Sequence, residues 1–455
     1  MTMPPQQRQT DQRQVLTAVR ELATWATDLR WEYVPVRVRD RLRLVLLDSL
    51  AVTMAGGRLP ERGALVTAWE LCPGPCPVLG AGLSTGAEPA AWLNASAMVS
   101  LEMDEGNKHA AGHPAAHGFP AVLALAAQRD CAGPPTAVAL LVAYEVAARF
   151  GRAAGLRPGV HPHGNWGLAG GAAGCARLLG VDADSMAAAM DTASGMPIAG
   201  HFAAALDGNP VRHEWMGATA VAGLAAARLA AAGAAHATGI AARSLGEVLG
   251  SFDPAELTDG LGSRWDVELG YFKRHASCAF THPAVDAVLR LREGLDVDEV
   301  TEVVLEVPSM VAALDDPRPQ TRLAAMFSLP FVTATAVLHG VVNPGSYTAE
   351  RLQDPRLSEL AARVRVVAAP DLDRRLPAER GARVLLSCRD GTEAERVVCN
   401  PIGDADHQPF DEPELLRVLA GLLGPGDALA RVCACADGLF DAPSVRPLLA
   451  ALAAP

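Results

Sequence analysis

The sequence contains very little lysine. Of its 39 basic residues only two, Lys108 and Lys273, are lysines, and both lie in histidine-rich segments. Aromatic residues are also scarce, at 5% of the 455 residues, whereas half of the residues are apolar. Because lysine and arginine differ as donors and in how readily they lose a proton, we interpret the two lysines as positions that require an ammonium group. The alternative is that they persist by chance.

Several common functional motifs are absent. The chain has no GxSxG turn, no phosphate-binding loop and no dinucleotide-binding motif, since the glycine-rich run at 164–174 follows no expected strand. The close cysteine pairs, at 72/76 and 433/435, lack the second pair or nearby histidine of a zinc site. No fixed-period repeat is present, which argues against a solenoid.

The charge and the cysteine distribution limit the partners and the compartment. A net charge of −12 argues against nucleic acid and anionic membrane, so an anionic substrate would need a local basic cluster. Residues 1–14 lack the apolar core of a secretory signal and the nine cysteines are scattered, so we expect a cytoplasmic protein. The apolar stretch 219–242 contains Arg228 and His236, and we expect buried helix there rather than a membrane span.

The hydrophobic pattern predicts two domains of different kinds. Helical periodicity dominates from Leu16 to about Arg264, and alternation typical of strands appears at 300–311, 362–370 and 382–399. After Pro401 the helical pattern returns. We therefore expect a mainly α protein with an α+β second domain. The expected parts are a large helical domain (1–270), a smaller α+β lid domain (271–403) and C-terminal helices that rejoin the helical domain (404–455).

Eight of the twelve histidines lie in four segments that mix histidine with glycine or proline and precede alanine-rich helical runs. We expect loops that lead into helices, where backbone N–H groups and the helix dipole favour anions. The segments are "NKHAAGHPAAHG" (107–118), "GVHPHGNWG" (159–167), "NPVRHEWMG" (209–217) and "FKRHASCAFTHPAVDA" (272–287).

The first segment allows three interpretations. Its histidines at 109, 113 and 117 would share a helix face, but glycine and proline at 112, 114 and 118 interrupt such a helix, and we expect the helix to begin near 120. A zinc site built on a loop, a solvated surface loop and an acid–base loop over a cleft all stay open. The charged residues of this stretch are Glu102, Asp104, Glu105 and Lys108.

The other three segments have structural alternatives as well. His161 on its turn could cap a helix. Arg212, beside His213, could hold a carboxylate with two hydrogen bonds or make a surface ion pair. Cys278, close to Lys273, would need a neighbouring base to act as a nucleophile, and a buried thiol is the better interpretation.

Taken in order, these segments resemble the MmgE/PrpD family, which includes 2-methylcitrate dehydratase and cis-aconitate decarboxylase. The resemblance runs from about residue 15 to 450. It rests on five stretches in the family's order, which are "LDSLAVTMAGG", "LNASAMVSLEMDEGNKHAAGHPAAHGFPAVLALAA", "GVHPHGNWGLAGGAAGCARLLGVD", "YFKRHASCAFTHPAVDAVL" and "AAMFSLPFVTATAVLHG".

The resemblance implies a homodimer without metal or organic cofactor, whose active site lies between a helical domain and a lid. It implies a small-molecule carboxylate as substrate. His113 matches the family's "HP" histidine and is expected to be the principal acid–base group, with Lys273, His161 and Asp104 as further catalytic residues. The expected substrate-binding residues are Arg212, Glu102, Glu105, His163, His213, Lys108, His275 and Cys278.

The family chemistry implies a lyase that passes through a carbanion next to a carboxylate. We expect a dehydratase of a hydroxylated di- or tricarboxylate, with a decarboxylase of a cis-aconitate-like acid or an epimerase as alternatives. The sequence departs from the family motifs at Glu102, His163 and Phe331, and it lacks the threonine after the acidic pair. These departures point to a substrate other than the usual one, or to a catalytically silent binding protein. A metal-dependent hydrolase is the last alternative.

Overall fold

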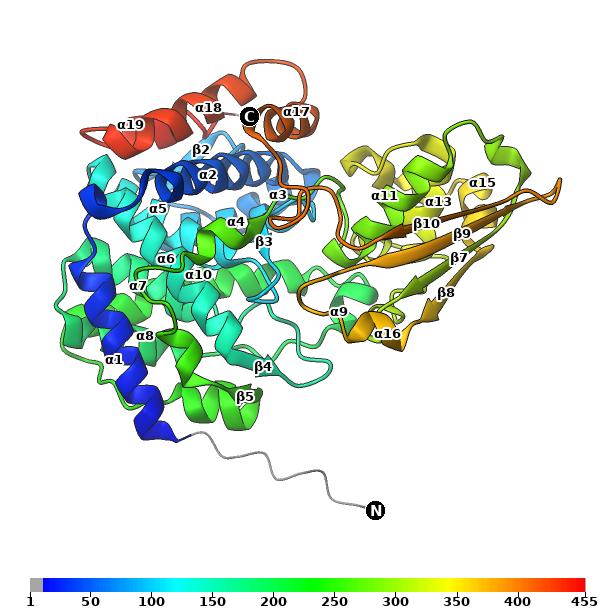
Figure 1. The fold of residues 1–455 in the computed structure, drawn as a ribbon. Coiled ribbons are helices and arrows are strands. Elements are labelled where there is room, and N and C mark those ends of the chain that lie inside the picture. The colour runs from blue at the N-terminus through cyan, green and yellow to red at the C-terminus, as the bar shows by residue number, and fades with distance from the viewer. Residues whose placement is uncertain (1–10, 455) are drawn as a thin grey trace.

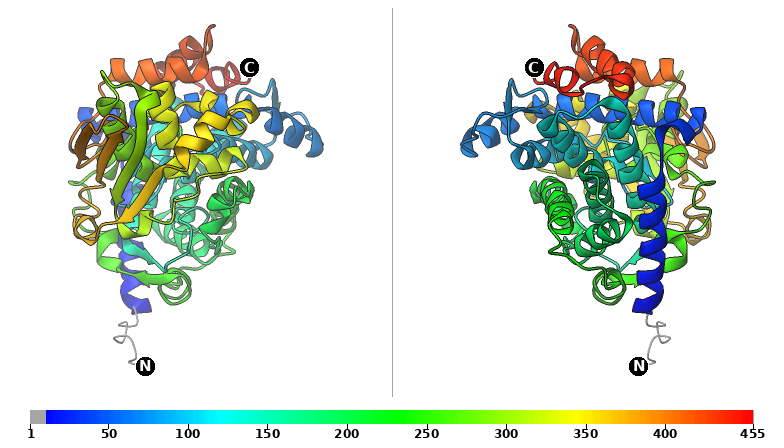
Figure 2. Two further views of the ribbon diagram at one scale, coloured as in Figure 1. Left: turned by 90° about the vertical axis from the view of Figure 1, so that its right-hand side faces the viewer. Right: turned by 90° about the vertical axis from the view of Figure 1, so that its left-hand side faces the viewer.

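The computed structural model describes residues 11–454 and shows a large helical domain beside a smaller α+β domain (Figure 1). Two further views show that the C-terminal helices lie on the helical domain (Figure 2). The helices of the N-terminal part are α1 (Gln12–Asp28), α2 (Val36–Gly57), α3 (Pro60–Ala68), α4 (Ala87–Met98), α5 (Pro114–Arg129), α6 (Gly133–Ala153), α7 (Leu168–Leu179), α8 (Ala183–Ser194), α9 (Ala203–Leu206) and α10 (Val211–Ala231).

Small residues let the central helices approach one another closely. A Cβ at Gly170 of α7 would lie 2.4 Å from the Ala143 carbonyl oxygen of α6, and one at Gly174 would lie 2.5 Å from Val122 of α5. Helix α10 packs against α7 and α4. The alanine-rich sequence thus produces closely packed helices, and the loops before α5, α7 and α10 are held in fixed positions.

Helix α5 begins earlier than the sequence predicted. Pro114 occupies its first turn, where a missing N–H costs nothing, and Pro120 lies inside the helix. Gly118 packs so closely on α6 that a Cβ there would lie 2.8 Å from the Ala143 Cβ. The expectation of a loop through residue 118 is therefore wrong, because tertiary packing overrides the local helix breakers. His113 directly precedes the helix, and His117 lies on it.

Short two-stranded pairs bring distant segments together within the N-terminal part. The pair of β3 (Gly106–Asn107) and β6 (Gly270–Tyr271) is antiparallel and joins the acidic segment to the approach to Lys273. The other pairs are β1 (Cys76–Val78) with β2 (Leu83–Thr85), and β4 (Ala154–Leu156) with β5 (Gly250–Phe252).

The α+β domain contains a four-stranded sheet in the order β10-β9-β7-β8, in which only β7 and β8 run parallel. The predicted hairpin at Asp390-Gly391 joins β9 to β10, and the Asp390 carboxylate accepts from the Thr392 N–H at 2.9 Å. The strands are β7 (Val300–Val307), β8 (Val364–Ala368), β9 (Ala382–Cys388) and β10 (Glu393–Val398). The helices are α11 (His282–Leu291), α12 (Arg322–Met326), α13 (Leu329–His339), α14 (Ala349–Leu352), α15 (Pro355–Ala361) and α16 (Pro370–Asp373).

The chain returns to the helical domain after the sheet. Helices α17 (Glu412–Leu423) and α18 (Ala428–Gly438) pack against α2, and α19 (Arg446–Ala450) lies at the end (Figure 1). Near the C-terminus, the carbonyl of Leu452 accepts from the Gly80 N–H at 3.0 Å. The expected fold class, a helical domain with an α+β domain inserted before C-terminal helices, is confirmed.

A buried ion pair fastens the segment that returns from the sheet to the helical domain. Lys108 Nζ lies 3.1 Å from Asp404 Oδ1 and 2.7 Å from Asp406 Oδ2, and it donates to the Ala378 carbonyl at 3.0 Å. The side chains of Lys108 and Asp404 are almost completely buried. Lys108 therefore connects the turn after β3 to the segment that follows β10.

We expect Lys108→Met to lower the free energy of unfolding by about 3–5 kcal/mol, because it leaves Asp404 buried without its cation. Urea titration followed by tryptophan fluorescence measures the change. The matched control is Arg356→Ala, because Arg356 pairs with Asp298 where both side chains are 68% exposed, and such a pair contributes at most about 1 kcal/mol. Equal effects of the two substitutions would contradict this role for Lys108.

Candidate active site

Four histidine-rich segments meet where the helical domain faces the α+β domain. The acidic residues follow α4, His113 precedes α5, His161 and His163 precede α7, and Arg212 begins α10. Lys273 follows strand β6, which pairs with β3 beside the acidic segment. The predicted convergence of these segments is therefore seen in the structure.

Two buried cations share one carboxylate at the centre of the cluster. Glu102 forms an ion pair with Arg212 through one carboxylate oxygen, and its other oxygen lies 3.1 Å from Lys273 Nζ. Lys273 Nζ also lies 3.5 Å from Asp104 Oδ1. Each of these four side chains is at most 2% exposed. Two cations and two carboxylates thus balance one another inside the protein, where an unpaired charge would be very costly.

Opposing effects set the ionisation of Lys273 and Asp104. Burial alone would lower the pKa of Lys273, but the charges of Asp104 and Glu102 outweigh it and raise the pKa above its ordinary value. Burial alone would raise the pKa of Asp104, but His113 and Lys273 outweigh it and lower that pKa below its ordinary value. Both groups are therefore charged at neutral pH.

The His113 ring is held at one nitrogen. Its Nδ1 lies 3.0 Å from Asp104 Oδ2 and 2.6 Å from the Glu105 carbonyl oxygen. Both neighbours are acceptors, so Nδ1 carries a hydrogen and Nε2 is the position that can exchange a proton. Nε2 has no hydrogen-bond partner within residues 11–454. This is the arrangement of an oriented acid–base histidine.

Three more histidines surround Arg212 and are kept neutral. Burial, followed by the charge of Arg212, lowers the pKa of His161, His163 and His213 well below the ordinary value. Arg212 Nε lies 3.4 Å from His161 Nε2, and Arg212 Nη2 lies 3.4 Å from His163 Nε2. The His113 and His163 rings lie 5.4 Å apart, centre to centre. The imidazole of His163 is thus close to that of His113, the oriented acid–base histidine.

Two carboxyl groups behind Asp104 are protonated at neutral pH. Burial first, and then the negative charge of neighbouring carboxyl groups, raise the pKa of both Asp48 and Glu105 to about 8. The Glu105 N–H donates to Asp48 Oδ2 at 3.1 Å, and the Glu105 carboxyl group accepts from Ala115 N at 2.7 Å and from the Tyr144 hydroxyl at 3.3 Å. Glu105 therefore fixes the loop to helix α5, and its carboxyl oxygens are hydrogen-bonded to Ala115 and Tyr144.

Sequence reasoning missed Asp48 as a site residue. It lies on α2, among buried apolar residues from Val45 to Ala55. A signal was present, because an acidic residue within a buried apolar helix face needs a partner. That partner comes from a distant segment, so the sequence alone does not identify it.

Two imidazole nitrogens of this cluster have no hydrogen-bond partner. His163 Nδ1 and His213 Nε2 are buried and unpartnered within the described part of the chain. A buried polar atom without a partner costs about 1–3 kcal/mol. These two nitrogens are therefore available to a polar ligand bound beside Arg212.

Three of the predicted binding residues do not contact the charged cluster. Lys108 pairs with Asp404 and Asp406, as described above. His275 Nε2 lies 2.9 Å from Asp286 Oδ1. Cys278 lies close enough for the charge of Glu102 to act on it, but burial first and that charge second raise the pKa of its thiol to about 11. A thiol with such a pKa is a poor nucleophile at neutral pH.

His117 is fully buried beside Trp166, with 4.7 Å between ring centres. Burial lowers its pKa to about 3, so this imidazole is neutral. His109 is only partly buried.

Among residues 11–454, no three histidine, cysteine or acidic side chains are arranged to hold a metal ion. No helix of the described chain is both long and apolar enough to cross a bilayer.

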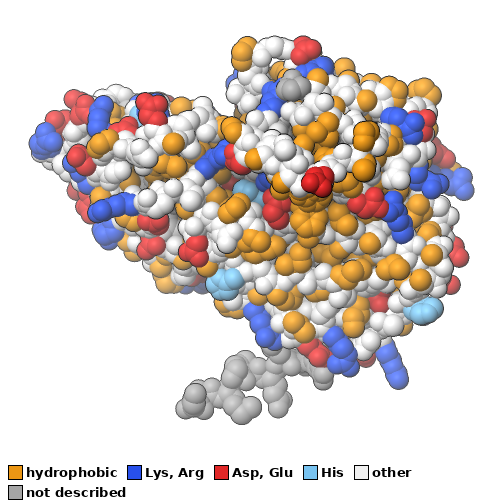
Figure 3. Space-filling model, turned by 180° about the vertical axis from the view of Figure 1, so that it is seen from behind, with side chains coloured by type: hydrophobic (Ala, Val, Ile, Leu, Met, Phe, Trp, Pro, Cys, Tyr) orange, Lys and Arg blue, Asp and Glu red, His pale blue; other side chains and the backbone are white. Residues whose placement is uncertain are grey.

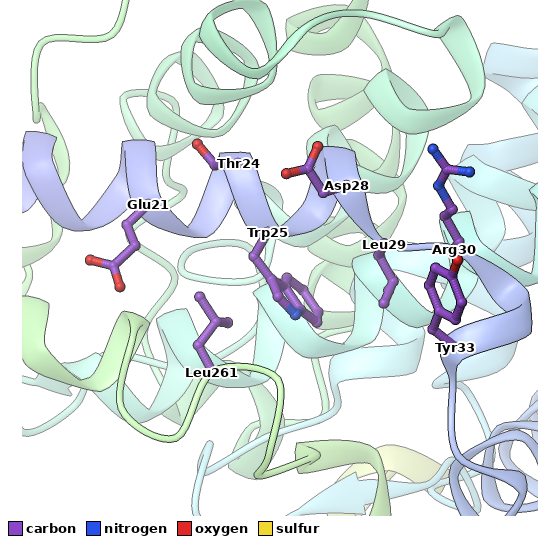
Figure 4. A pocket seen from close by; sticks show the side chains of 8 residues that line it. All are labelled: Glu21, Thr24, Trp25, Asp28, Leu29, Arg30, Tyr33 and Leu261. Carbon is purple, nitrogen blue, oxygen red and sulfur yellow. The ribbon is translucent and has the colours of Figure 1, made fainter.

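A groove and one face of the described surface can be compared with this cluster. An open groove of about 500 Å³ follows α1, lined by Trp25, Tyr33 and Leu261 among others, and it contains no histidine (Figure 4). On the face seen in Figure 3, basic and acidic side chains are intermixed and form no large basic patch. The cations that could hold an anionic ligand in the candidate site are therefore interior ones.

The chain belongs to the MmgE/PrpD family. Residues 20–256 match the MmgE/PrpD N-terminal domain, and residues 275–424 match the MmgE/PrpD C-terminal domain. A cis-aconitate decarboxylase of Aspergillus terreus is 26% identical over 470 residues, which are 96% of each chain. The cis-aconitate decarboxylase-like protein oryM of Aspergillus oryzae is 26% identical over 479 residues, 94% of this chain and 96% of its own. Human cis-aconitate decarboxylase is 26% identical over 304 residues, 62% of each chain.

The protonated Asp48 predicts a pH-dependent stability. Between the unfolded pKa of about 4 and the folded pKa of about 8, the native state keeps a proton that the unfolded state has lost. The contribution of Asp48 to stability is therefore complete below about pH 4 and decreases as the pH rises to about 8. Asp48→Asn keeps an acceptor for the Glu105 N–H and cannot ionise.

We therefore expect the melting temperature of Asp48→Asn to rise relative to that of the unsubstituted protein as the pH increases from 5 to 9. Differential scanning fluorimetry at each pH measures this difference. The control is Asp40→Asn on the exposed face of the same helix, which should show no such trend. A constant difference across the pH range for Asp48→Asn would show that this carboxyl group is ionised in the native state.

Proposed function

We propose that this chain is a lyase that acts on a small carboxylate substrate through a carbanion next to a carboxylate, with decarboxylation as the first candidate reaction. The single observation that carries the proposal is the position of His113. Its Nδ1 is held by Asp104, and the buried cations Arg212 and Lys273 pair with Glu102 and Asp104 directly beside it.

In a decarboxylation at this site, Arg212 and Lys273 hold the carboxylate that remains on the substrate. The C–C bond to the departing carboxylate breaks, its electron pair stays on the carbon, and CO2 leaves. That charge spreads into the remaining carboxylate, where cations stabilise the transition state more than the ground state. His113 Nε2 then delivers a proton to the carbon, and the Asp104 carboxylate stabilises the protonated ring at Nδ1.

A bound carboxylate also changes the charge balance of the cluster. Before binding, the two cations are matched by Glu102 and Asp104. A substrate carboxylate adds a negative charge that Arg212 and Lys273 can hold beside His113.

Dehydration is the second candidate, and one observation favours it. A dehydratase needs one group to remove the α-proton and another to protonate the departing hydroxide. The His113 and His163 rings, 5.4 Å apart, supply two such groups. Decarboxylation needs one proton donor, and the names of the fungal and human relatives support that reaction.

The two reactions are distinguished by their products. Incubation with cis-aconitate, with citrate and with 2-methylcitrate is followed by proton NMR and by trapping of CO2. Release of CO2 supports the decarboxylase, whereas an unsaturated product without CO2 supports the dehydratase. Deuterium from the solvent in recovered substrate, with neither product, would point to the epimerase and against a lyase.

We expect His113→Gln to lower kcat by about 10²–10⁴-fold, because it removes the group that transfers the proton. Steady-state turnover of the accepted acid measures the effect. The control is His109→Gln, because His109 is a partly buried histidine of the same segment that does not contact the cluster. Undiminished turnover by His113→Gln would refute the assignment of this residue.

We also propose a cytoplasmic homodimer, on the basis of the family resemblance and of the cysteine distribution. Light scattering coupled to size-exclusion chromatography tests the oligomeric state directly. A single species with the mass of one chain would contradict the dimer.

A further inference from the structure

The His163 ring is fully buried between the acid–base histidine and a cation. Its ring lies edge-on to that of His113, with 5.4 Å between ring centres and 84° between ring planes, and the residue is 0% exposed. Arg212 Nη2 lies 3.4 Å from its Nε2. His163 is also one of the positions at which the sequence departs from the family motifs. These two contacts place its imidazole inside the candidate site.

Arg212 determines which nitrogen of His163 carries the hydrogen. A guanidinium group can only donate, so His163 Nε2 accepts and the hydrogen of the neutral ring is on Nδ1. The ring is neutral because burial first, and then the charge of Arg212, lower its pKa well below the ordinary value. His163 Nδ1 has no hydrogen-bond partner among residues 11–454. His163 therefore has one uncharged N–H donor that lacks an acceptor.

Hydrogen bonds fix the turn that contains His163. Its backbone N–H donates to His161 Nδ1 at 3.0 Å, and Asn165 Nδ2 donates to the His161 carbonyl at 2.7 Å. The next residue, Gly164, has a φ of +90°, and its carbonyl accepts from the Ile198 N–H at 2.7 Å. The unpartnered donor is therefore held in place before a ligand binds, which is the condition for preorganised stabilisation.

The group that leaves the substrate is the acceptor that fits this donor. In the proposed decarboxylation, Arg212 and Lys273 hold the carboxylate that remains. His113 protonates the carbon from which CO2 departs, so the departing carboxylate lies near the His113 ring and the adjoining His163 ring. A cation there would stabilise the ground-state charge that is lost as CO2 forms, and would oppose the reaction. A neutral N–H orients the same group with one hydrogen bond.

We propose that His163 is a substrate-contacting residue whose Nδ1–H donates a hydrogen bond to an oxygen of the carboxylate that leaves as CO2. This proposal rests on the proposed function, because it assigns a partner to the departing group of that reaction. Two substrate carboxylates are then distinguished by charge. The cations Arg212 and Lys273 hold the carboxylate that gains electron density, and the neutral donor holds the one that loses it.

Two substitutions test the two ring nitrogens separately. His163→Asn keeps an N–H donor near the place of Nδ1, whereas His163→Gln keeps a polar atom near the place of Nε2. We expect kcat/KM for the accepted acid to fall about 10- to 100-fold in His163→Gln, as for one lost hydrogen bond to a charged acceptor, and less than about fivefold in His163→Asn. If His163 acted only by holding Arg212, the order of the two variants would be reversed, and the proposal would be overturned.

The matched control is His201→Asn. His201 is exposed, and its Nδ1 accepts from the Ala203 N–H at 3.1 Å, a bond that an asparagine oxygen can replace. This variant should leave kcat/KM and the melting temperature unchanged. A loss of activity that follows the melting temperature in both His163 variants would show a structural role and overturn the contact.

A binding measurement separates this proposal from the proposed reaction. Isothermal titration calorimetry with tricarballylate, a saturated tricarboxylate, needs no turnover. Weaker binding to His163→Gln than to His163→Asn would support the contact even if none of the three acids is converted. Equal binding by the two variants would overturn the contact, even if CO2 is released from an accepted acid.

Discussion

The site depends on the burial of Glu102 between two cations. Arg212 and Lys273 come from segments 61 residues apart in the sequence, and each is almost fully buried against the same carboxylate. Neither cation could be buried alone, because desolvation of an unpaired charge costs several kcal/mol. The pairing therefore allows both cations to be buried next to His113, whereas basic and acidic side chains are intermixed on the surface seen in Figure 3.

Two carboxyl groups and two imidazoles near the central charges are neutral, because burial and one neighbouring charge act on each of them in the same direction. Asp48 and Glu105 keep their protons, since burial and the charge of Asp104 oppose further negative charge. The imidazoles of His161 and His163 are neutral for the opposite reason, which is burial next to Arg212. Oriented charges inside a shell of neutral polar groups form a preorganised environment for a reaction that moves negative charge onto a substrate carboxylate.

The sequence predicted most of the elements but not the position of each site residue. The strands and their Asp390-Gly391 hairpin followed from alternation and turn chemistry, which are local properties. The start of helix α5 at Pro114 was missed, because its first turns depend on the close contact of Gly118 with α6, which is a tertiary effect. Lys108 was predicted near the substrate with Lys273, but its nearest charges are those of Asp404 and Asp406, on a segment about 300 residues away in the chain.

The sequence by itself determined the two kinds of domain, the four histidine-rich segments and the family resemblance, because periodicity and ordered motifs are written along the chain. The tertiary structure decided which carboxyl groups keep a proton and which nitrogen of His113 is held by Asp104. These properties depend on burial and on distances between groups far apart in sequence. For that reason Asp48 became recognisable only when the fold had brought it close to Asp104 and the Glu105 N–H.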